Sequence, residues 1–151
     1  MQASRKIYKP IILNIYMPVN YLSVLLAGVA SMVLGFLWYG LLFGKTWIKL
    51  MKFSEKDIKE GKKKGMAKLY VVNFISSLVT AFILALLIAL TNAVTVSNSM
   101  FLALMLWLGF IATTTLGSVL WERKSFKLYL LNNSYNLINL LAVSIILAIL
   151  R

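Results

Sequence analysis

The sequence contains no cysteine and no histidine, and only 4 of its residues are acidic. Without cysteine there is no thiolate nucleophile and no disulfide framework. Without either residue type there is no Cys/His zinc or haem site, and no imidazole for acid–base chemistry. The chain also lacks a glycine-rich phosphate loop and a cluster of metal-ligand residues. We therefore predict no cofactor, no metal site and no enzymatic activity.

Charged residues are also missing from three long stretches of the chain. These stretches lie between Lys9 and Lys45, between Lys68 and Glu122, and between Lys127 and Arg151. The chain is 61% hydrophobic, and its mean hydropathy is +0.86. A helix needs about 20 mostly apolar residues to cross the hydrocarbon layer of a bilayer. The sequence therefore predicts an integral membrane protein.

The longest of these stretches is too long for one crossing, and turn-forming residues interrupt it at 91–99. We predict four transmembrane spans, over 20–44, 69–90, 100–121 and 128–150. The spans should be helical, because backbone exposed to lipid must satisfy its own hydrogen bonds. The predicted fold is an all-α integral membrane four-helix bundle, a single domain over 17–151.

The basic residues are concentrated in two loops. Residues 45–68 hold nine lysines against three acids, and the segment 122–127 adds one arginine and two lysines against Glu122, whereas 91–99 is uncharged. Cytoplasmic loops are rich in lysine and arginine, so we predict that both basic loops are cytoplasmic and both termini outside. The expected partners of this charge are the lipid bilayer and its anionic head groups rather than nucleic acid.

The N-terminal extension, residues 1–16, conflicts with this orientation because its Arg5, Lys6 and Lys9 would face outward. Two explanations are open. The extension is a charged tail that the larger basic loop overrides, or natural translation starts at Met17 and the extension is not native.

The loop between the first two spans is amphipathic and basic. Apolar residues from Trp47 to Phe53 alternate with lysines, as in an interfacial helix, and Ser54 is placed to cap a short charged helix that ends near Gly61. The loop is either a surface that docks lipid or a partner, or a solvated connector.

Small residues recur at four-residue spacing in the first three spans, which puts them on one helix face and lets helix backbones approach closely. The positions predicted to pack are Ala27, Ser31, Gly35, Gly40, Gly44, Ala81, Ala85, Gly109 and Gly117. With so few residues available to enclose a pathway within one chain, we also predict a homo-oligomer.

Polar side chains gather in the half of each span nearest the basic loops, and the other half is almost wholly aliphatic. The candidate pocket residues are Trp38, Tyr39, Asn73, Ser77, Thr113, Thr114, Asn132, Tyr135, Asn136 and Asn139. An unpaired amide in hydrocarbon costs several kcal/mol, so these groups need polar partners or water. Two interpretations are open: a pocket that faces the cytoplasm, or hydrogen bonds that join the helices, each worth about 0.6–2 kcal/mol.

Several short motifs occur in a distinctive order. They are Gly35-Phe36-Leu37-Trp38-Tyr39-Gly40-Leu41-Leu42-Phe43-Gly44-Lys45-Thr46-Trp47, Leu106-Trp107-Leu108-Gly109-Phe110, Gly117-Ser118-Val119-Leu120-Trp121-Glu122 and Asn132-Asn133-Ser134-Tyr135. Over about 20–150 they resemble the small bacterial membrane-protein family called domain of unknown function 1761. The resemblance implies four transmembrane helices and a bacterial inner membrane, but no activity. The chain differs from many members in having Leu41 in place of a proline and Trp121 in place of a phenylalanine.

Two classes of function remain for such a protein. One is a passive conduit or carrier for a small solute that uses the polar pocket. Proton-coupled transport is disfavoured because the spans hold no acid, base or histidine. The other is a non-catalytic scaffold or accessory protein that binds lipid or a partner chain. An embedded enzyme is disfavoured, because a hydroxyl nucleophile would have no activating base at membrane depth.

Overall fold

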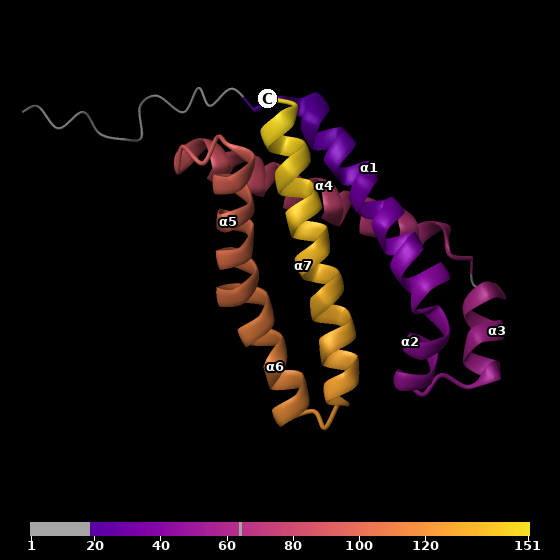
Figure 1. The fold of residues 1–151 in the computed structure, drawn as a ribbon. Coiled ribbons are helices and arrows are strands. Elements are labelled where there is room, and N and C mark those ends of the chain that lie inside the picture. Colours follow the sequence, from indigo (N-terminus) through magenta and orange to yellow (C-terminus); the bar gives the residue numbers. More distant parts are fainter. Residues whose placement is uncertain (1–18, 64) are drawn as a thin grey trace, which may run out of the picture.

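A computed structural model describes residues 19–63 and 65–151, so the extension 1–16 and Met17 lie outside the described residues. The described chain is all-helical and contains no strand (Figure 1). Its elements are α1 (Tyr21–Phe36), η2 (Leu37–Leu42), α2 (Gly44–Leu50), α3 (Glu55–Lys63), α4 (Ala67–Leu90), α5 (Val96–Leu106), η3 (Trp107–Ala112), α6 (Thr113–Leu120) and α7 (Phe126–Ile149). The two η elements are π-helical turns inside longer helices.

Within the described residues, four continuous helices are long and apolar enough to cross a membrane, which confirms the predicted fold class. They are Tyr21–Leu42, Ala67–Leu90, Val96–Leu120 and Phe126–Ile149. The third helix starts earlier than predicted because Thr95 caps it, with its hydroxyl accepting a hydrogen bond from the Asn98 amide. The fourth also starts earlier, at Phe126, because Ser125 accepts from the Lys127 amide.

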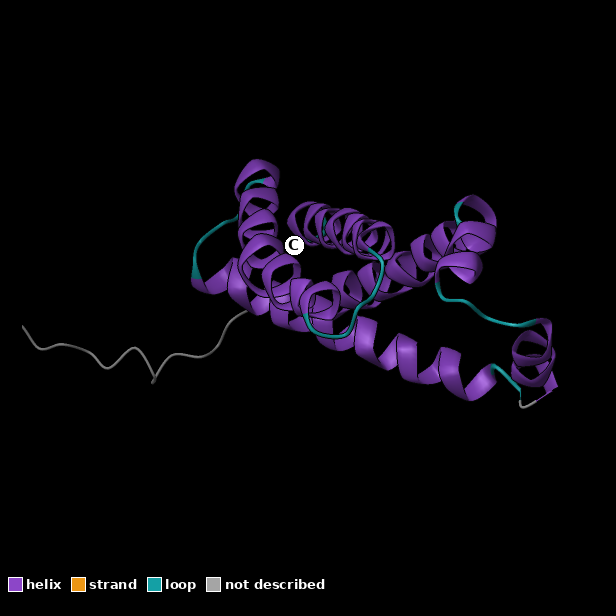
Figure 2. Cartoon of the chain, turned by 90° about the horizontal axis from the view of Figure 1, so that it is seen from below, coloured by secondary structure: helices purple, strands orange, loops and turns teal. Residues whose placement is uncertain are grey.

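The helices are arranged around α7. One side of α7 contacts α1, and the other contacts α5, η3 and α6. Helix α4 packs mainly on α1 and runs across the back of the molecule, since it appears lengthwise in both Figure 1 and Figure 2 while α7 is nearly end-on in Figure 2. We call the end with α2, α3 and the turn before α7 the loop end, and the opposite end, where α1 begins and α7 finishes, the Arg151 end.

The hydrophobic core lies toward the Arg151 end, where α1, α4, α5 and α7 converge. Its buried members are Val24, Ala27, Ala81, Leu84, Ile88, Ala103, Leu140, Val143 and Leu147. Alanines occur where helices meet, because a small side chain lets two backbones approach and gain dispersion contacts. Gly28 serves the same purpose: an added Cβ would lie 2.6 Å from Leu78 Cδ2 on α4.

The predicted small-residue stripes differ in where they lie. Ala27, Ser31 and Ala81 are buried between α1 and α4, and Ala85 is half-buried near them. Gly109 instead is exposed, with no atom within 4 Å of the position its Cβ would take, and Gly117 is half-buried with only Trp121 near that position. The stripe on the third span is therefore not covered by another helix of the described chain.

The π-helical turns η2 and η3 break the regular α-helical spacing of the first and third spans. In η2 the Phe43 amide donates to the Trp38 carbonyl at 2.8 Å, five residues back. A π turn holds one extra residue, so side chains beyond it are rotated relative to those before it. Gly40 and Gly44 therefore do not share a packing face: Gly40 is exposed beside the Phe36 ring, and Gly44 is buried against the Tyr39 carbonyl.

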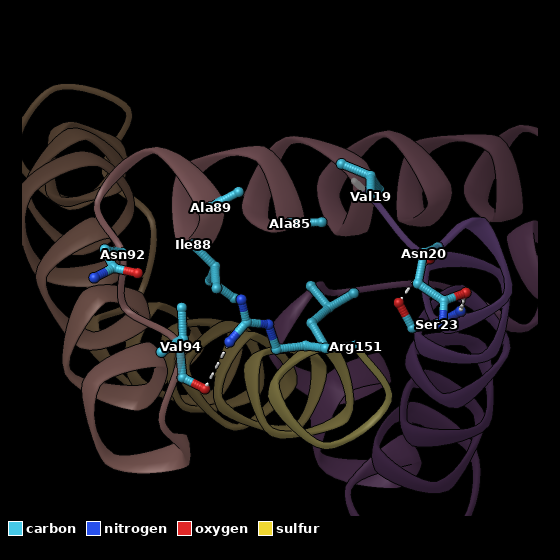
Figure 3. Close-up of a pocket in the computed structure, with 10 residues that line it drawn as sticks. Val19, Asn20, Ser23, Ala85, Ile88, Ala89, Asn92, Val94 and Arg151 are labelled. Carbon is cyan, nitrogen blue, oxygen red and sulfur yellow. Dashed lines mark hydrogen bonds between the residues drawn. The ribbon is translucent and has the colours of Figure 1, made fainter. Parts of the chain in front are cut away.

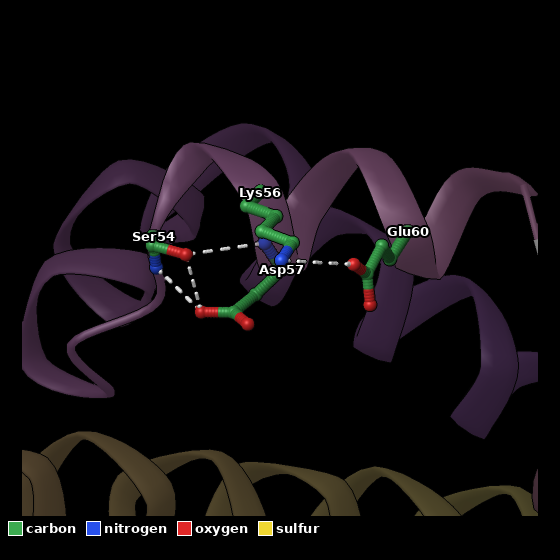
Figure 4. Close-up of polar contacts among 4 residues, drawn as sticks. All are labelled: Ser54, Lys56, Asp57 and Glu60. Atoms are coloured by element: carbon green, nitrogen blue, oxygen red, sulfur yellow. Dashed lines mark hydrogen bonds and ion pairs between the residues drawn. The ribbon is translucent and has the colours of Figure 1, made fainter.

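Two short helices form the loop end next to α7. Helix α2 half-buries Trp47, Ile48 and Leu50 and exposes Lys45 and Lys49. The first turn of α3 is closed by a reciprocal cap, in which the Asp57 amide donates to Ser54 Oγ while Ser54 N and Oγ donate to Asp57 Oδ2 at 2.8 and 2.7 Å (Figure 4). These bonds from Ser54 lower the pKa of Asp57. The cap thus holds the start of α3 in place, and it weakens only as the pH falls through that lowered pKa.

Candidate functional site

The polar residues of α7 point to two different neighbours. Successive residues on an α-helix are about 100° apart, so Asn132 and Asn133 cannot face the same element. Asn132 and Tyr135 face the first span, whereas Tyr129 and Asn133 face the third. The half of the described chain nearest the loop end accordingly contains two polar clusters rather than one.

The first cluster, which we call the α1 cluster, consists of Trp38, Tyr39, Asn132 and Tyr135. The Tyr39 hydroxyl donates to Asn132 Oδ1 at 3.1 Å, and its ring meets the Tyr135 ring edge-on with centroids 4.9 Å apart. The Trp38 ring lies 6.3 Å from the same tyrosine. The Tyr135 hydroxyl sits over Gly35, where an added Cβ would lie 3.1 Å away. Four of the predicted pocket residues therefore do meet.

Aromatic rings extend the α1 cluster to the loop end. The Tyr39 ring contacts Trp47 of α2 with centroids 5.7 Å apart, and Trp47 contacts Phe53 at 5.4 Å. Trp38 packs against Phe43 at 4.5 Å. Edge-on aromatic pairs add about 0.5–1.5 kcal/mol beyond their buried area, so this series fixes α2 against α7.

The second cluster, which we call the α6 cluster, consists of Trp107, Thr115, Tyr129 and Asn133. The buried Asn133 amide donates to Thr115 Oγ1 at 3.0 Å and to the Tyr129 carbonyl at 3.1 Å, and its Oδ1 lies 3.1 Å from the same threonine oxygen. Trp107 Nε1 donates to the Asn133 carbonyl at 3.0 Å, and the Tyr129 hydroxyl donates to the Ala112 carbonyl at 2.9 Å. Each of these four side chains thus bonds a carbonyl or hydroxyl nearby.

Four other predicted pocket residues make no hydrogen bond to either cluster: Asn73, Ser77, Thr113 and Thr114. Thr113 and Thr114 are exposed and donate to carbonyls of their own helix, Gly109 and Phe110. Ser77 pairs with Ser31 at 3.3 Å. Asn73 is exposed on α4, where its amide is 3.8 Å from Met32 Sδ. The predicted pocket residues Asn73, Thr113 and Thr114 do not bond the α7 amides, because α4 crosses α1 and, of the run Thr113–Thr115, only Thr115 faces α7.

Two buried polar atoms near the α1 cluster have no hydrogen-bond partner among the described residues. They are Trp38 Nε1, a donor, and Asn139 Oδ1, an acceptor. Asn139 lies four residues beyond Tyr135 and hence one turn further along the same face of α7. Asn136 is half-buried between them, and none of the hydrogen bonds of the described chain involves its side chain. Buried groups of this kind normally bind water or another polar molecule.

The predicted pocket residues did not include Trp107, Thr115, Tyr129 or Asn133, although Thr115 and Asn133 lie in the polar half of the spans that the sequence indicates. One signal was available: Leu-Trp-x-Gly occurs twice, at 37–40 and at 106–109, and each copy coincides with a π-helical turn. Both tryptophans meet α7 at neighbouring positions, Trp38 near Tyr135 and Trp107 at Asn133. The repeat thus marks where the first and third spans bend around α7.

The chemistry of both clusters is hydrogen bonding and packing. Their side chains are amides, hydroxyls and aromatic rings, which donate and accept hydrogen bonds and pack against one another. The clusters can therefore join helices or hold a neutral polar molecule.

Comparison with known proteins identifies a family. The sequence profile described as "Protein of unknown function (DUF1761)" matches residues 22–148, which is most of the chain. This match confirms the family resemblance of the sequence motifs. No curated protein and no solved structure matches the chain.

Proposed function

We propose that this chain, which belongs to the DUF1761 family, is a non-catalytic membrane scaffold. It binds a partner helix through the half of α4 nearest the loop end, residues 67–78, which we call the loop-end half of α4. One observation carries the proposal: most of the surface of this half-helix is uncovered. The successive residues Leu69, Tyr70, Val71 and Val72 project in four different directions, yet they are 64, 51, 58 and 54% exposed. A membrane helix that is packed over only part of its surface presents the rest to lipid or to another protein.

The polar residues of this half-helix favour protein over lipid. Ser76 and, just beyond this half, Thr80 donate to carbonyls of their own helix, so lipid can surround them. The exposed Asn73 amide has only the long contact to Met32 Sδ. An amide left in hydrocarbon costs several kcal/mol, and a hydrogen bond to a neighbouring helix removes that cost.

We propose that the partner helix belongs to a second copy of the chain. The uncovered face of the third span has matching properties, since Gly109 has open space and Thr113 is exposed beside it. Small side chains there would let α4 of another copy approach, and threonine oxygens can accept from Asn73. The loop end, with its lysines, would lie among anionic cytoplasmic head groups, as the charge distribution of the sequence favours.

Cysteine cross-linking tests this interface cleanly, because the chain has no cysteine of its own. Chains with Ser76→Cys and Thr113→Cys, mixed in bilayers, are expected to form a mixed disulfide dimer. The added change Asn73→Leu is expected to reduce its yield by about threefold, from the loss of one interhelical hydrogen bond. Val33→Cys, which is also exposed but lies on α1, is the control for random collision. A yield no higher than the control, with a monomer by mass photometry, would reject the proposal.

A solute conduit is the second candidate, and the unpartnered Trp38 Nε1 and Asn139 Oδ1 support it. A neutral solute that exchanges hydrogen bonds with these two atoms could move along the interface between α1 and α7. The division of the other polar side chains into two internally bonded clusters makes this candidate the weaker one.

Proteoliposome swelling with glycerol as the probe tests the conduit. Flux above that of protein-free liposomes is expected if the path exists, and Asn139→Leu is expected to return it to the protein-free rate. Ser134→Ala changes an exposed hydroxyl on the same helix and is the matched control. Equal flux through wild type, Asn139→Leu and empty liposomes would eliminate this candidate.

A further inference from the structure

A cavity of about 200 Å³ lies at the Arg151 end, remote from both polar clusters (Figure 3). It is enclosed by the start of α1, the last turns of α4, the turn that follows α4, and the end of α7. Residues that line it and matter below are Asn20, Ser23, Ala85, Ala89, Asn92 and Arg151. The cavity has one polar wall and one apolar wall.

The polar wall is held rigidly in place. The Asn20 side chain caps α1 by accepting from the Leu22 and Ser23 amides, and its own amide donates to the Leu150 carbonyl at 2.9 Å. Ser23 donates to the Asn20 carbonyl at 2.7 Å. One side chain thus ties the beginning of α1 to the end of α7, and this places Arg151 beside the turn after α4.

The charge of this wall comes from the Arg151 guanidinium, and no Asp or Glu side chain lies near it. Arg151 Nη1 donates to the Val94 carbonyl at 3.4 Å, as Figure 3 shows, and a guanidinium has further N–H groups available for an anion. All four acidic residues of the sequence lie between 55 and 122, in α3 and in the turn before α7 at the loop end. Most of the length of α7, about 30 Å, separates the two ends, so these acids cannot neutralise Arg151.

The apolar wall comes mostly from α4. Ala85 and Ala89, together with Ile88, face the cavity, and the small alanines leave the space that a larger residue would fill. The exposed Asn92, with a positive φ of 53°, ends this wall and adds an amide at the turn. A guanidinium opposite an aliphatic surface suits a ligand with an anionic oxygen group and an attached hydrocarbon part.

We propose that this cavity binds a phosphate group, with Arg151 as its principal ligand and the Ala85–Ala89 surface of α4 against the carbons attached to it. The planar fork of arginine matches two phosphate oxygens at once, which an ammonium group cannot do. The apolar wall favours the phosphodiester of an anionic phospholipid over free phosphate. This site is independent of the α4 interface proposed above, which lies in the other half of that helix.

Native mass spectrometry of the full chain released from nanodiscs tests the site. The probe is a bilayer of phosphatidylcholine with a minor fraction of phosphatidylglycerol, and the readout is the ratio of the two lipids retained per protein. Wild type is expected to retain phosphatidylglycerol preferentially. Arg151→Gln is expected to lower that preference roughly tenfold, the loss of one charged hydrogen-bonding group, and Arg151→Lys is expected to lower it less.

Further variants and a competition experiment distinguish a bound phospholipid from free phosphate. Ala89→Phe fills the cavity without changing charge and is expected to remove the preference. Lys127→Gln removes a positive charge at the loop end, where no such cavity is present, and is expected to lower the preference much less than Arg151→Gln does. Inorganic phosphate that displaces the lipid, where chloride at equal ionic strength does not, would keep the phosphate site but assign it to the free anion. A preference that survives Arg151→Gln, or that survives Ala89→Phe in a protein of unchanged melting temperature, would overturn the proposal.

Discussion

Gly44→Ala is expected to destabilise the protein by about 1–3 kcal/mol, the usual range for forcing an atom into occupied space. A Cβ at this position would lie 2.6 Å from the carbonyl oxygen of Tyr39. That oxygen belongs to the backbone of the π turn and cannot rotate away as a side chain could. The junction between η2 and α2 must therefore shift, and with it the contact of Trp47 with Tyr39. The measurement is the free energy of unfolding in detergent.

Gly40→Ala is the matched control, four residues earlier in the same segment. Its Cβ would make only an ordinary contact, 3.7 Å from the Phe36 ring. Alanine is more favourable than glycine in a helix by up to about 1 kcal/mol, so this change is expected to be neutral or stabilising. Opposite signs at the two glycines are the expected result. Equal destabilisation at both would mean that they pack together, as their spacing in the sequence suggests.

Asn133→Leu is expected to destabilise the protein by about 2 kcal/mol, because it removes two hydrogen bonds of the α6 cluster, each worth about 0.6–2 kcal/mol in a membrane. The side chain is 4% exposed and joins α7 to Thr115 on α6. Leucine has a similar size but leaves the Tyr129 carbonyl without its side-chain donor. Ser134→Ala, at the exposed next position, is expected to change the unfolding free energy by less than about 0.5 kcal/mol.

A double-mutant cycle shows whether the effect comes from this hydrogen bond. Thr115→Val alone should cost less than Asn133→Leu, since it leaves the Asn133 amide bonded to the Tyr129 carbonyl. The double variant should be less destabilised than the sum of the two single variants, because both remove the same bond. Strict additivity would show that the two side chains do not interact and that packing alone accounts for the loss.

The long helices could be predicted from the sequence because hydropathy acts locally. The predicted spans agree with the observed helices to within a few residues, and the differences occur where Thr95 and Ser125 supply caps. The candidate site could be predicted only in part from the sequence. Asn132, Tyr135 and Tyr39 were predicted to share a pocket and do meet, but Asn73, Thr113 and Thr114, predicted for the same pocket, lie elsewhere. The one-residue insertion of each π turn changes which residues share a face. Four-residue spacing in the sequence assumes a regular α-helix and therefore does not predict this change.

The sequence by itself determined that this protein lies in a membrane, that it does so with four helices, and that its amides and hydroxyls gather toward the basic loops. Those properties follow from the cost of placing each side chain in hydrocarbon, which depends on little beyond the residue itself. The tertiary structure alone decided how the amides of α7 divide between two neighbours, that α4 crosses the others with much of its loop-end half uncovered, and that Arg151 faces a cavity. These depend on helix rotation and crossing, which arise from contacts between residues far apart in the chain.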